Sequence, residues 1–476
     1  MTPLAQTRRA PGAVAQIIPS QSSLVICFVL QDMAPFKVIV VGGGPNGITL
    51  SHALHHAGID FVVLERRENV FEDTGASLVL SPHNLRVFHQ LGILENVQEI
   101  GAPFLHISHS FTPKGQYFSR TYGLSRIRDN HGTALLAFHR ARIVREIYDG
   151  LPDEAKDRYF TNRKLVDISI SDTGVEVTCE DGSSYTGTIV IGADGVHSKT
   201  RSIMRRLALE ANPALEQTWD PEVPFPSHYK CLWASFTRDT EVGESYETQG
   251  HNRSAMYLTG LEKGWIFLYE KLPKPTTERA IYDKEAVRAF AESFADWQVH
   301  EKLTIRDIIN KESFVSGMAN LQEGVAQKKS WAGRIVLVGD ACHRFTPNAG
   351  LGFNSGVQDV VSLSNKLQAL INKSPSDVPD AEALEKAFQD YQQERKEPLA
   401  KDYQDAAAAT RLQAWASWTY YILARYIFSF RFVRNYLANT SAATSIKGGR
   451  VLDFIPAVEP FNGRIPWDHK LKKQLD

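Results

Sequence analysis

Cysteine is scarce in this chain of 476 residues. The four cysteines lie at positions 27, 179, 231 and 342, with no CxxC pair and no histidine at metal-ligand spacing. This pattern excludes a disulfide framework, predicts no metal site, and is typical of a reducing compartment. We expect the Cys342 thiol to be buried and without a redox role.

Excess charge is also missing, because the formal net charge is −1. A chain without a positive field is a poor binder of nucleic acid, so we predict no nucleic-acid partner.

The first residues do not form a long apolar segment. The run from Leu24 to Leu30 is too short to span a bilayer, and no small-residue cleavage site follows it. We predict that residues 1–34 form a disordered extension, with an unused upstream start or a weak anchor as alternatives.

Strand and helix patterns alternate after that extension. The β-branched run 36–41 predicts a buried strand, 46–56 a helix, and 61–64 a second strand, which together form a βαβ unit. Ser81 and Pro82 are typical of a helix start. The alternation then breaks, because 165–171 and 175–180 flank a turn and predict an antiparallel hairpin.

A second group of strands is predicted over 229–270, in the segments YKCLWASF, SAMYLTG and GWIFLYE. The run 334–338 returns to the parallel-sheet pattern, and helix is predicted from about 355 to 440. The apolar segments 232–236 and 265–269 could line a substrate pocket or form the core of this domain.

A glycine-rich turn follows the first strand. Gly42, Gly44 and Gly47 form a GxGxxG pattern that opens a helix, and Glu65 ends the second strand. The glycines permit a tight turn, close approach of a pyrophosphate and close helix packing, and the acid can accept hydrogen bonds from a ribose. The pattern predicts a dinucleotide site, although a glycine-rich turn beside a surface glutamate is the alternative.

Two further strand ends carry an acid. Residues 189–198 (IVIGADGVHS) run from a strand into a turn that contains Asp194, a geometry that aspartate and glycine also favour without any ligand. Residues 334–359 contain Asp340 after a strand, where its carboxylate could hold a ribityl or ribose hydroxyl. A turn without bulky side chains follows, where a flat ring could approach the backbone and a helix start could stabilise negative charge. The residues assigned to this part of the cofactor site are Pro347, Ala349, Gly350, Leu351, Gly352, Phe353 and Asn354.

These motifs resemble those of the para-hydroxybenzoate-hydroxylase-like flavoprotein monooxygenases, in the form found in fungal secondary metabolism. The resemblance covers about residues 36–370 in order and spacing. It includes His139 to Ile143, which is similar to an Arg-x-x-Leu element whose arginine, here Arg140, contacts the flavin dinucleotide. Ala76 is assigned to the same site. Leu351 departs from the pattern, since many relatives have glutamine there.

The resemblance implies an α/β fold in which a Rossmann-like FAD-binding domain carries an inserted, mostly antiparallel substrate domain, with a helical C-terminus. The expected FAD-binding domain has three parts, at 35–165, 187–215 and 326–400. A small β insertion is expected at 166–186, a substrate domain at 216–325 and a helical end at 401–476.

The implied activity is that of an FAD-dependent oxidoreductase that uses NAD(P)H as a transient electron donor. One oxygen atom of O₂ is added to a hydrophobic terpenoid, meroterpenoid or polyketide by epoxidation or hydroxylation. The alternatives are a halogenase, a prenyl reductase, or a non-catalytic escort protein of the same fold; the halogenase Trp-x-Trp-x-Ile-Pro pattern is absent from the sequence. No catalytic base is evident, and the candidates are polar groups in the expected regions, namely Arg201, Tyr257, Tyr269 and His251.

The segment 415–433 (WASWTYYILARYIFSFRFV) is apolar and aromatic but contains Arg425 and Arg431. Charges near the middle of a spanning helix are costly. The composition is typical of an interfacial helix in contact with a membrane surface, or of a helix packed on the FAD domain. The expected localisation is therefore cytoplasmic, or membrane-associated on the cytosolic face.

Overall fold

The protein is described here from a computed structural model. It describes residues 14–17, 26–29, 36–73, 75–106, 108–373 and 378–472. Near the start of the chain, β1 (Val14–Ile17) pairs antiparallel with β2 (Ile26–Val29). The rest of the predicted extension 1–34 lies outside the described residues, as does part of the apolar run at 24–30, so the prediction of disorder there stays a prediction.

A six-stranded sheet forms the centre of the larger part of the molecule. Its strands are parallel except for the last one, which is antiparallel to its neighbour. Their order is β10 (Tyr159–Phe160), β4 (Asp60–Leu64), β3 (Lys37–Val41), β14 (Ile189–Gly192), β24 (Ile335–Leu337) and β23 (Ser330–Trp331). The predicted buried strand is confirmed, since Val38, Ile39 and Val40 are fully buried.

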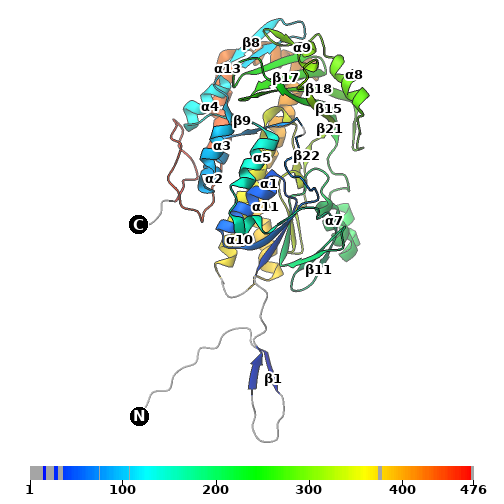
Figure 1. Cartoon of the computed structure of the whole chain (residues 1–476), viewed down its shortest axis with the longest axis vertical. Helices are drawn as coiled ribbons and strands as arrows, with labels where there is room; N and C mark the ends of the chain where they lie inside the picture. Colours follow the sequence, from blue (N-terminus) through cyan, green and yellow to red (C-terminus); the bar gives the residue numbers. More distant parts are fainter. Residues whose placement is uncertain are drawn as a thin grey trace.

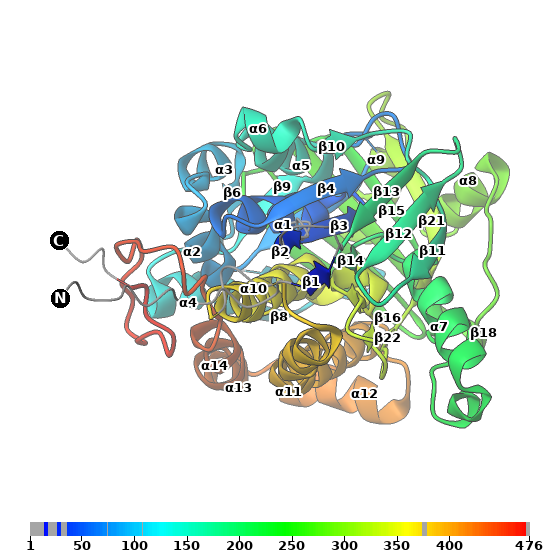
Figure 2. The same cartoon turned by 90° about the horizontal axis from the view of Figure 1, so that it is seen from below.

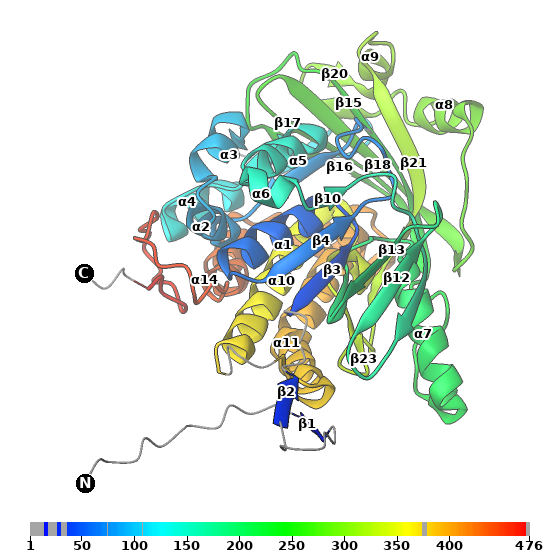
Figure 3. The same cartoon turned by 60° about the horizontal axis from the view of Figure 1, so that its bottom comes forward.

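Helices cover one face of this sheet, and a small β-meander covers the other (Figure 3). The helical layer includes α1 (Pro45–His56), α5 (Arg140–Asp149), α10 (Leu351–Ile371) and α11 (Ala381–Gln413). The opposite layer contains β11 (Leu165–Ile170), β12 (Val175–Cys179), β13 (Ser184–Gly187) and α7 (Lys199–Ala211). The predicted βαβ unit and antiparallel hairpin are both present.

A second, seven-stranded sheet lies above the first in Figure 1. All its neighbouring strands are antiparallel except β7 and β16. The order is β21 (Val315–Gln322), β15 (Ser227–Thr237), β18 (Lys263–Thr276), β17 (Arg253–Thr259), β16 (Ser245–Gly250), β7 (Ser108–Phe111) and β8 (Tyr117–Thr121). Residues 108–121 therefore pair with the predicted substrate domain, although the sequence placed them within the range 35–165.

The two faces of the second sheet have different neighbours, because successive side chains of a strand point to opposite sides. One face carries Leu232, Tyr257 and Ile266 and packs against α8 (Lys284–Glu292) and α9 (Ile305–Ile309). The other carries Met256, Leu258 and Phe267. This second face is turned toward the first sheet.

Shorter elements make up the rest of the described fold up to α10. One group is a three-stranded sheet of β5 (Ser77–Leu80), β9 (Leu136–His139) and β6 (Ala102–Pro103), with α2 (Pro82–Gln90), α3 (Leu94–Ile100), α4 (Gly123–His131) and α6 (Asp153–Lys156). The others are η1 (Pro213–Gln217), β19 (Gln298–His300), β20 (Leu303–Thr304), β22 (Gly324–Val325), η2 (Gly339–Ala341), β25 (His343–Arg344) and η3 (Pro347–Ala349).

Helical structure continues beyond α11 in short pieces, and Figure 2 shows α11 to α14 gathered on one side of the molecule. The pieces are α12 (Trp418–Ile422), η4 (Leu423–Ile427), α13 (Arg431–Leu437), η5 (Ala438–Ala442) and α14 (Ala443–Lys447). Helix therefore extends a few residues beyond the predicted end at about 440, and residues 448–472 contain no helix or strand. Across the part of the chain that the structure describes, no helix has the length and apolar character needed to cross a bilayer.

Candidate active site

A cavity of about 1100 Å³ lies between the two sheets. Four of the parallel strands, β3, β4, β14 and β24, deliver their carboxyl ends to it, and the residues that follow these strands line it: Gly42, Gly44, Glu65, Asp194 and Asp340. Ligands bind at this edge of open α/β sheets. The three sequence motifs therefore meet at one site.

Each glycine of the first turn is required for a different structural reason. Gly42 has φ +105°, and a Cβ there would lie 2.5 Å from the carbonyl oxygen of Ala193. A Cβ at Gly47 would lie 2.0 Å from the Gly42 oxygen, so Gly47 allows helix and strand to pack and does not line the cavity. Gly44 has open space on its Cβ side, next to the N-terminus of α1, which no side chain caps. An anion can approach the backbone there.

Glu65 is buried and fixed in place. Its Oε2 accepts a hydrogen bond from the Gly43 N–H at 2.8 Å, and its Oε1 accepts two from Arg67 at 2.9 Å. Burial alone would raise the pKa of this carboxyl, but the Arg67 contacts and the Gly43 N–H outweigh it and lower the pKa. The carboxylate therefore stays charged and retains acceptor capacity for a ribose hydroxyl.

Asp194 precedes helix α7 and contacts its first turn. Its Oδ1 accepts from the Ser198 hydroxyl at 2.6 Å, and its Oδ2 accepts from the Thr200 N–H at 2.9 Å and the Thr200 hydroxyl at 3.0 Å. These contacts satisfy a helix terminus, which is the structural role that the sequence left open. The residue also lines the cavity, so the two roles coexist.

Asp340 and Arg140 lie on the cavity wall together with Arg344. Asp340 forms an ion pair with Arg344 at 3.0 Å. Burial lowers the pKa of Arg140, while the nearby Asp340 charge acts in the opposite direction. Ala76 does not line the cavity; its carbonyl oxygen accepts a hydrogen bond from the Arg140 N–H at 3.0 Å and so positions that residue.

Only some of the predicted residues in the turn after Asp340 line the cavity. They are Pro347, Ala349, Gly350, Gly352 and Phe353. Leu351 and Asn354 lie outside the lining. The Asn354 side chain accepts from the Ser81 N–H at 2.9 Å and donates to the Val79 and Gly350 carbonyls at 2.7 Å, so it braces the turn instead.

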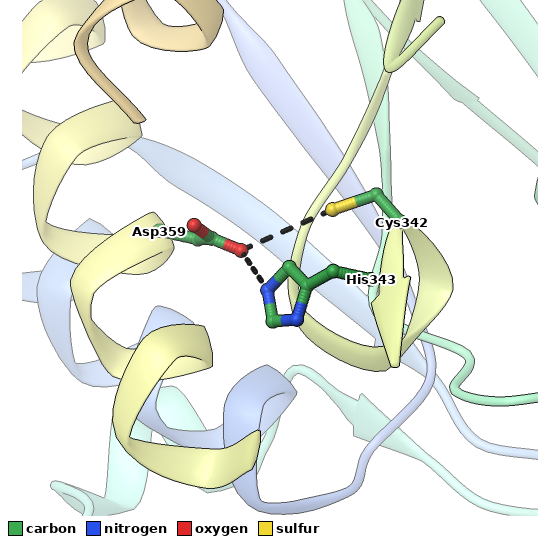
Figure 4. A group of neighbouring side chains, drawn as sticks. All are labelled: Cys342, His343 and Asp359. Carbon is green, nitrogen blue, oxygen red and sulfur yellow. Dashed lines mark hydrogen bonds and ion pairs between the residues drawn. The ribbon is translucent and has the colours of Figure 1, made fainter. Parts of the chain in front are cut away.

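A buried polar cluster includes Cys342 and His343, which lie close to Asp340 in the sequence, and Asp359 (Figure 4). Asp359 of α10 accepts from the Gly339 N–H at 3.0 Å, from His343 Nε2 at 2.7 Å and from Arg395 Nε at 2.7 Å. The Cys342 thiol lies 3.9 Å from the same carboxylate, and burial raises its pKa. Cys342, His343 and Asp359 are close enough to share a metal ion, but the guanidinium of Arg395 already supplies the positive charge next to Asp359.

Neither catalytic candidate lines the cavity. Arg201 donates to the Ala341 carbonyl at 2.7 Å and lies over the Phe225 ring, so it joins two loops of the FAD-binding part. Tyr257 lies on the opposite face of the second sheet, where its hydroxyl is 2.7 Å from that of Thr240. The further candidates Tyr269 and His251 are also absent from the lining, so the catalytic role of all four stays a prediction.

Sequence reasoning missed the residues that form the remainder of the wall. The second sheet contributes Ser108, Thr121, Ser245, Glu247, Met256, Leu258 and Phe267, and the C-terminal helices contribute Arg434, Ala438 and Ala442. Of the two aromatic strand segments predicted as lining, only Phe267 reaches the cavity. The alternation of side chains along a strand assigns the residues of each segment to two faces. It does not show which of the two faces is turned toward the cavity.

Comparison with known proteins decides the family. A family model described as "FAD binding domain" matches residues 35–401. The chain belongs to this family. It is an FAD-dependent monooxygenase of the para-hydroxybenzoate-hydroxylase-like type, with FAD as its cofactor and NAD(P)H as the electron donor typical of the family. The predicted recognition, fold class, enzyme class and cofactor are confirmed.

Fungal relatives are similar along most of this monooxygenase. The FAD-dependent monooxygenase ausM of Penicillium brasilianum is 31% identical over 407 residues, which cover 84% of each chain. The FAD-dependent monooxygenase spyC of Aspergillus fumigatus is 32% identical over 437 residues, covering 89% of this chain and 88% of that one. These relatives indicate a place in fungal secondary metabolism.

Solved structures share the fold. Klebsiella pneumoniae HpxO complexed with FAD and uric acid has a TM-score of 0.67 at 19% identity, covering 86% of this chain and 97% of that chain. A salicylate hydroxylase substrate complex has a TM-score of 0.62 at 16% identity, covering 87% and 98%. At these identities the likeness concerns the fold alone.

Proposed function

We propose that this monooxygenase binds FAD in the cavity between the sheets and epoxidises or hydroxylates a hydrophobic terpenoid, meroterpenoid or polyketide. The observation that carries the proposal is the division of the cavity wall. Three cofactor motifs occupy one side, and Met256, Leu258 and Phe267 present an apolar surface on the other.

The residues present fit FAD. Gly44 and the N-terminus of α1 offer backbone N–H groups to a pyrophosphate, Glu65 offers an acceptor to a ribose, and Asp340 offers one to a ribityl hydroxyl. When bound, FAD supplies the redox chemistry that takes electrons from NAD(P)H to O₂ and delivers one oxygen atom to the substrate. The apolar side chains of the second sheet exclude water from the reacting groups.

The test is substrate-stimulated NADPH oxidation by the purified, FAD-loaded protein. Prenylated aromatic compounds and polyenes are compared with small polar aromatic compounds such as salicylate, and products are analysed for one added oxygen atom by mass spectrometry. We expect stimulation and oxygen addition with the lipophilic compounds. Turnover confined to the small polar acids would contradict the proposed substrate class.

We also propose that the C-terminal helices contact a membrane surface peripherally. The segment is broken between η4 and α13, and large apolar side chains project from it into solvent; Trp418 is 71% exposed and Phe432 is 72% exposed. The exposed set is Trp418, Ile422, Tyr426, Ile427, Phe430, Phe432, Tyr436 and Leu437. A surface of aromatic rings of this kind suits the headgroup region of a bilayer.

The same segment also forms part of the cavity wall, through Arg434, Ala438 and Ala442. Its arginines are held by the protein, since Arg425 lies over the Phe118 ring at 4.3 Å and Arg431 over the Tyr122 ring at 4.5 Å. The interfacial and the packed alternatives are therefore compatible. A membrane contact at this place would deliver a lipophilic substrate beside the cavity.

Sedimentation with vesicles of phosphatidylcholine and phosphatidylserine tests the membrane contact. The triple variant Trp418→Ser, Phe432→Ser, Tyr436→Ser is expected to lose binding that the wild type shows. Ile281→Ser with Val458→Ser is the matched control, because both side chains are highly exposed but lie elsewhere. Equal sedimentation of wild type and triple variant would refute a contact through this surface.

A further inference from the structure

A single acidic side chain occupies the sheet side of the cavity. Glu247 of β16 lies in one cross-strand row with Met256 of β17 and Phe267 of β18, and all three line the cavity. Among the described residues of the second sheet that line the cavity, Glu247 is the only charged one. A carboxylate in an otherwise apolar row is costly unless it is hydrogen-bonded, so its partners need to be identified.

Two buried carboxamides fix the orientation of Glu247. Its Oε1 accepts from Gln413 Nε2 at 2.9 Å, and its Oε2 accepts from Gln249 Nε2 at 3.0 Å. The Gln249 side chain is itself held, because its Oε1 accepts from the Trp415 indole N–H at 3.0 Å. Gln249 is 1% exposed and Gln413 is 7% exposed, so neither partner can leave toward solvent without cost.

Glu247 forms no ion pair in the part of the chain that the structure describes. Within the described ranges, no lysine, arginine or histidine forms an ion pair with Glu247, whereas Glu65 and Asp340 are paired with arginines. Each carboxylate oxygen has about two acceptor positions, and each carboxamide uses only one. Glu247 therefore keeps acceptor capacity on the side that faces the cavity.

A short chain of hydrogen bonds joins Glu247 to the predicted flavin-binding turn. Gln413 accepts through Oε1 from Asn348 Nδ2 at 2.5 Å, and Asn348 lies in η3, between Pro347 and Ala349. The Thr410 hydroxyl donates to Asn348 Oδ1 at 2.8 Å and completes the connection to α11. A substrate group held by Glu247 would thus have a defined position relative to this turn.

We propose that Glu247 is a specificity-determining residue that accepts a hydrogen bond from a hydroxyl or N–H group of the substrate. The substrate is then an apolar molecule with at least one such donor, for example a prenylated phenol, and the oxidised carbon lies at a fixed distance from that donor. The inference rests on the proposed function, because it concerns the substrate of the same cavity. It excludes pure hydrocarbons as preferred substrates.

The competing explanation is structural, since Glu247 could serve only to tie α11 to the second sheet through Gln413. Loss of activity in a variant would not separate the two. Discrimination between a donor-bearing ligand and its methylated analogue does separate them, because a purely structural residue affects both ligands equally.

The experiment titrates the FAD-loaded protein with a geranylated resorcinol and with its dimethyl ether, following the flavin absorption spectrum. Wild type is expected to bind the phenol about 10-fold or more tightly than the ether, as a hydrogen bond to a charged group predicts. Glu247→Gln should reduce this ratio to within about 3-fold of unity on the same basis. Glu247→Asp, which keeps the charge, should retain a preference for the phenol.

Glu262→Gln is the matched control, because Glu262 also belongs to this sheet region but its side chain is 75% exposed and lies outside the cavity lining. It should leave the preference for the phenol over the ether unchanged.

Two results would overturn the inference. One is equal binding of the phenol and the ether by wild type, and the other is an undiminished preference for the phenol in Glu247→Gln with FAD still bound. Failure of wild-type protein to bind either compound would overturn the proposed substrate class and, with it, this inference. If Glu247→Gln does not retain FAD, Glu247→Asp carries the test, and loss of its preference for the phenol would overturn the inference.

Discussion

Replacing Asp359 with asparagine should destabilise the protein strongly, although the side chain does not line the cavity. The carboxylate is fully buried and accepts hydrogen bonds from the Gly339 N–H, His343 and Arg395. Asparagine has nearly the same shape, but it removes the negative charge and turns an acceptor atom into a donor. The Arg395 guanidinium, only 5% exposed, would then remain buried without its counter-charge.

The expected loss is about 3–5 kcal/mol in the free energy of unfolding, which is the usual cost of removing one partner of a buried ion pair. Burial alone would raise the pKa of Asp359, but His343 and Arg395 outweigh it and hold the pKa well below its ordinary value. Since a depressed carboxyl pKa stabilises the fold above the unfolded pKa of about 3.9, the full contribution is present at pH 7 and is lost only as the pH falls below about 4.

Urea unfolding at pH 7, followed by tryptophan fluorescence, measures this loss. Asp390→Asn is the matched control, because Asp390 pairs with Lys386 on the exposed surface of α11 and such pairs contribute about 0.5 kcal/mol or less. A second measurement is the FAD content, which should fall in Asp359→Asn because Asp359 positions the turn that carries Asp340. If Asp359→Asn is within about 1 kcal/mol of wild type, the reasoning about the buried cluster is refuted.

Three further variants follow from the cofactor side of the cavity and from the core. Asp340→Ala should lose FAD and activity together, and full flavin occupancy would contradict the role assigned to this carboxylate. Gly42→Val should also lose FAD, because the positive φ at this position disfavours a side chain and the new Cβ would lie 2.5 Å from a carbonyl oxygen. Gly58→Ala is the control and should keep FAD, because nothing lies within 4 Å of its new Cβ. Burial lowers the pKa of His52 from 6.5 to about 4, so the unfolded state binds the proton more tightly and stability falls as the pH drops from about 6.5 toward 4. The free energy of unfolding is measured at pH 7 and at pH 5, and the difference between the two values should be about 2 kcal/mol smaller in His52→Gln than in wild type. The same difference in both proteins would contradict this explanation.

The cofactor side of the molecule could be predicted from the sequence because local rules determine it. A continuous β-branched run, a glycine turn and a helix start specify β3, the turn at Gly42 and α1 within one or two residues. The acid at the end of each parallel strand then reaches the same edge of the sheet by topology alone. For the same reason, the sequence alone predicts Glu65, Asp194 and Asp340 as site residues, and all three line the cavity.

The substrate side could not be predicted in this way. Side chains alternate along β17 and β18, so one face holds Tyr257 and the other Met256 and Phe267, and only tertiary packing decides which face meets the cavity. Glu247 was missed because an isolated acid in a strand of polar residues carries no local signal. The contribution of residues 434–442 depends on the break between η4 and α13, where the apolar segment was expected to continue as one helix.

The visible absorption spectrum of the purified protein, recorded before and during aerobic incubation with NADPH and a prenylated aromatic compound, tests the central claim most directly. The account predicts the absorption bands of bound oxidised flavin, and NADPH consumption that the added compound accelerates. A colourless protein that cannot be reconstituted with FAD would contradict the account.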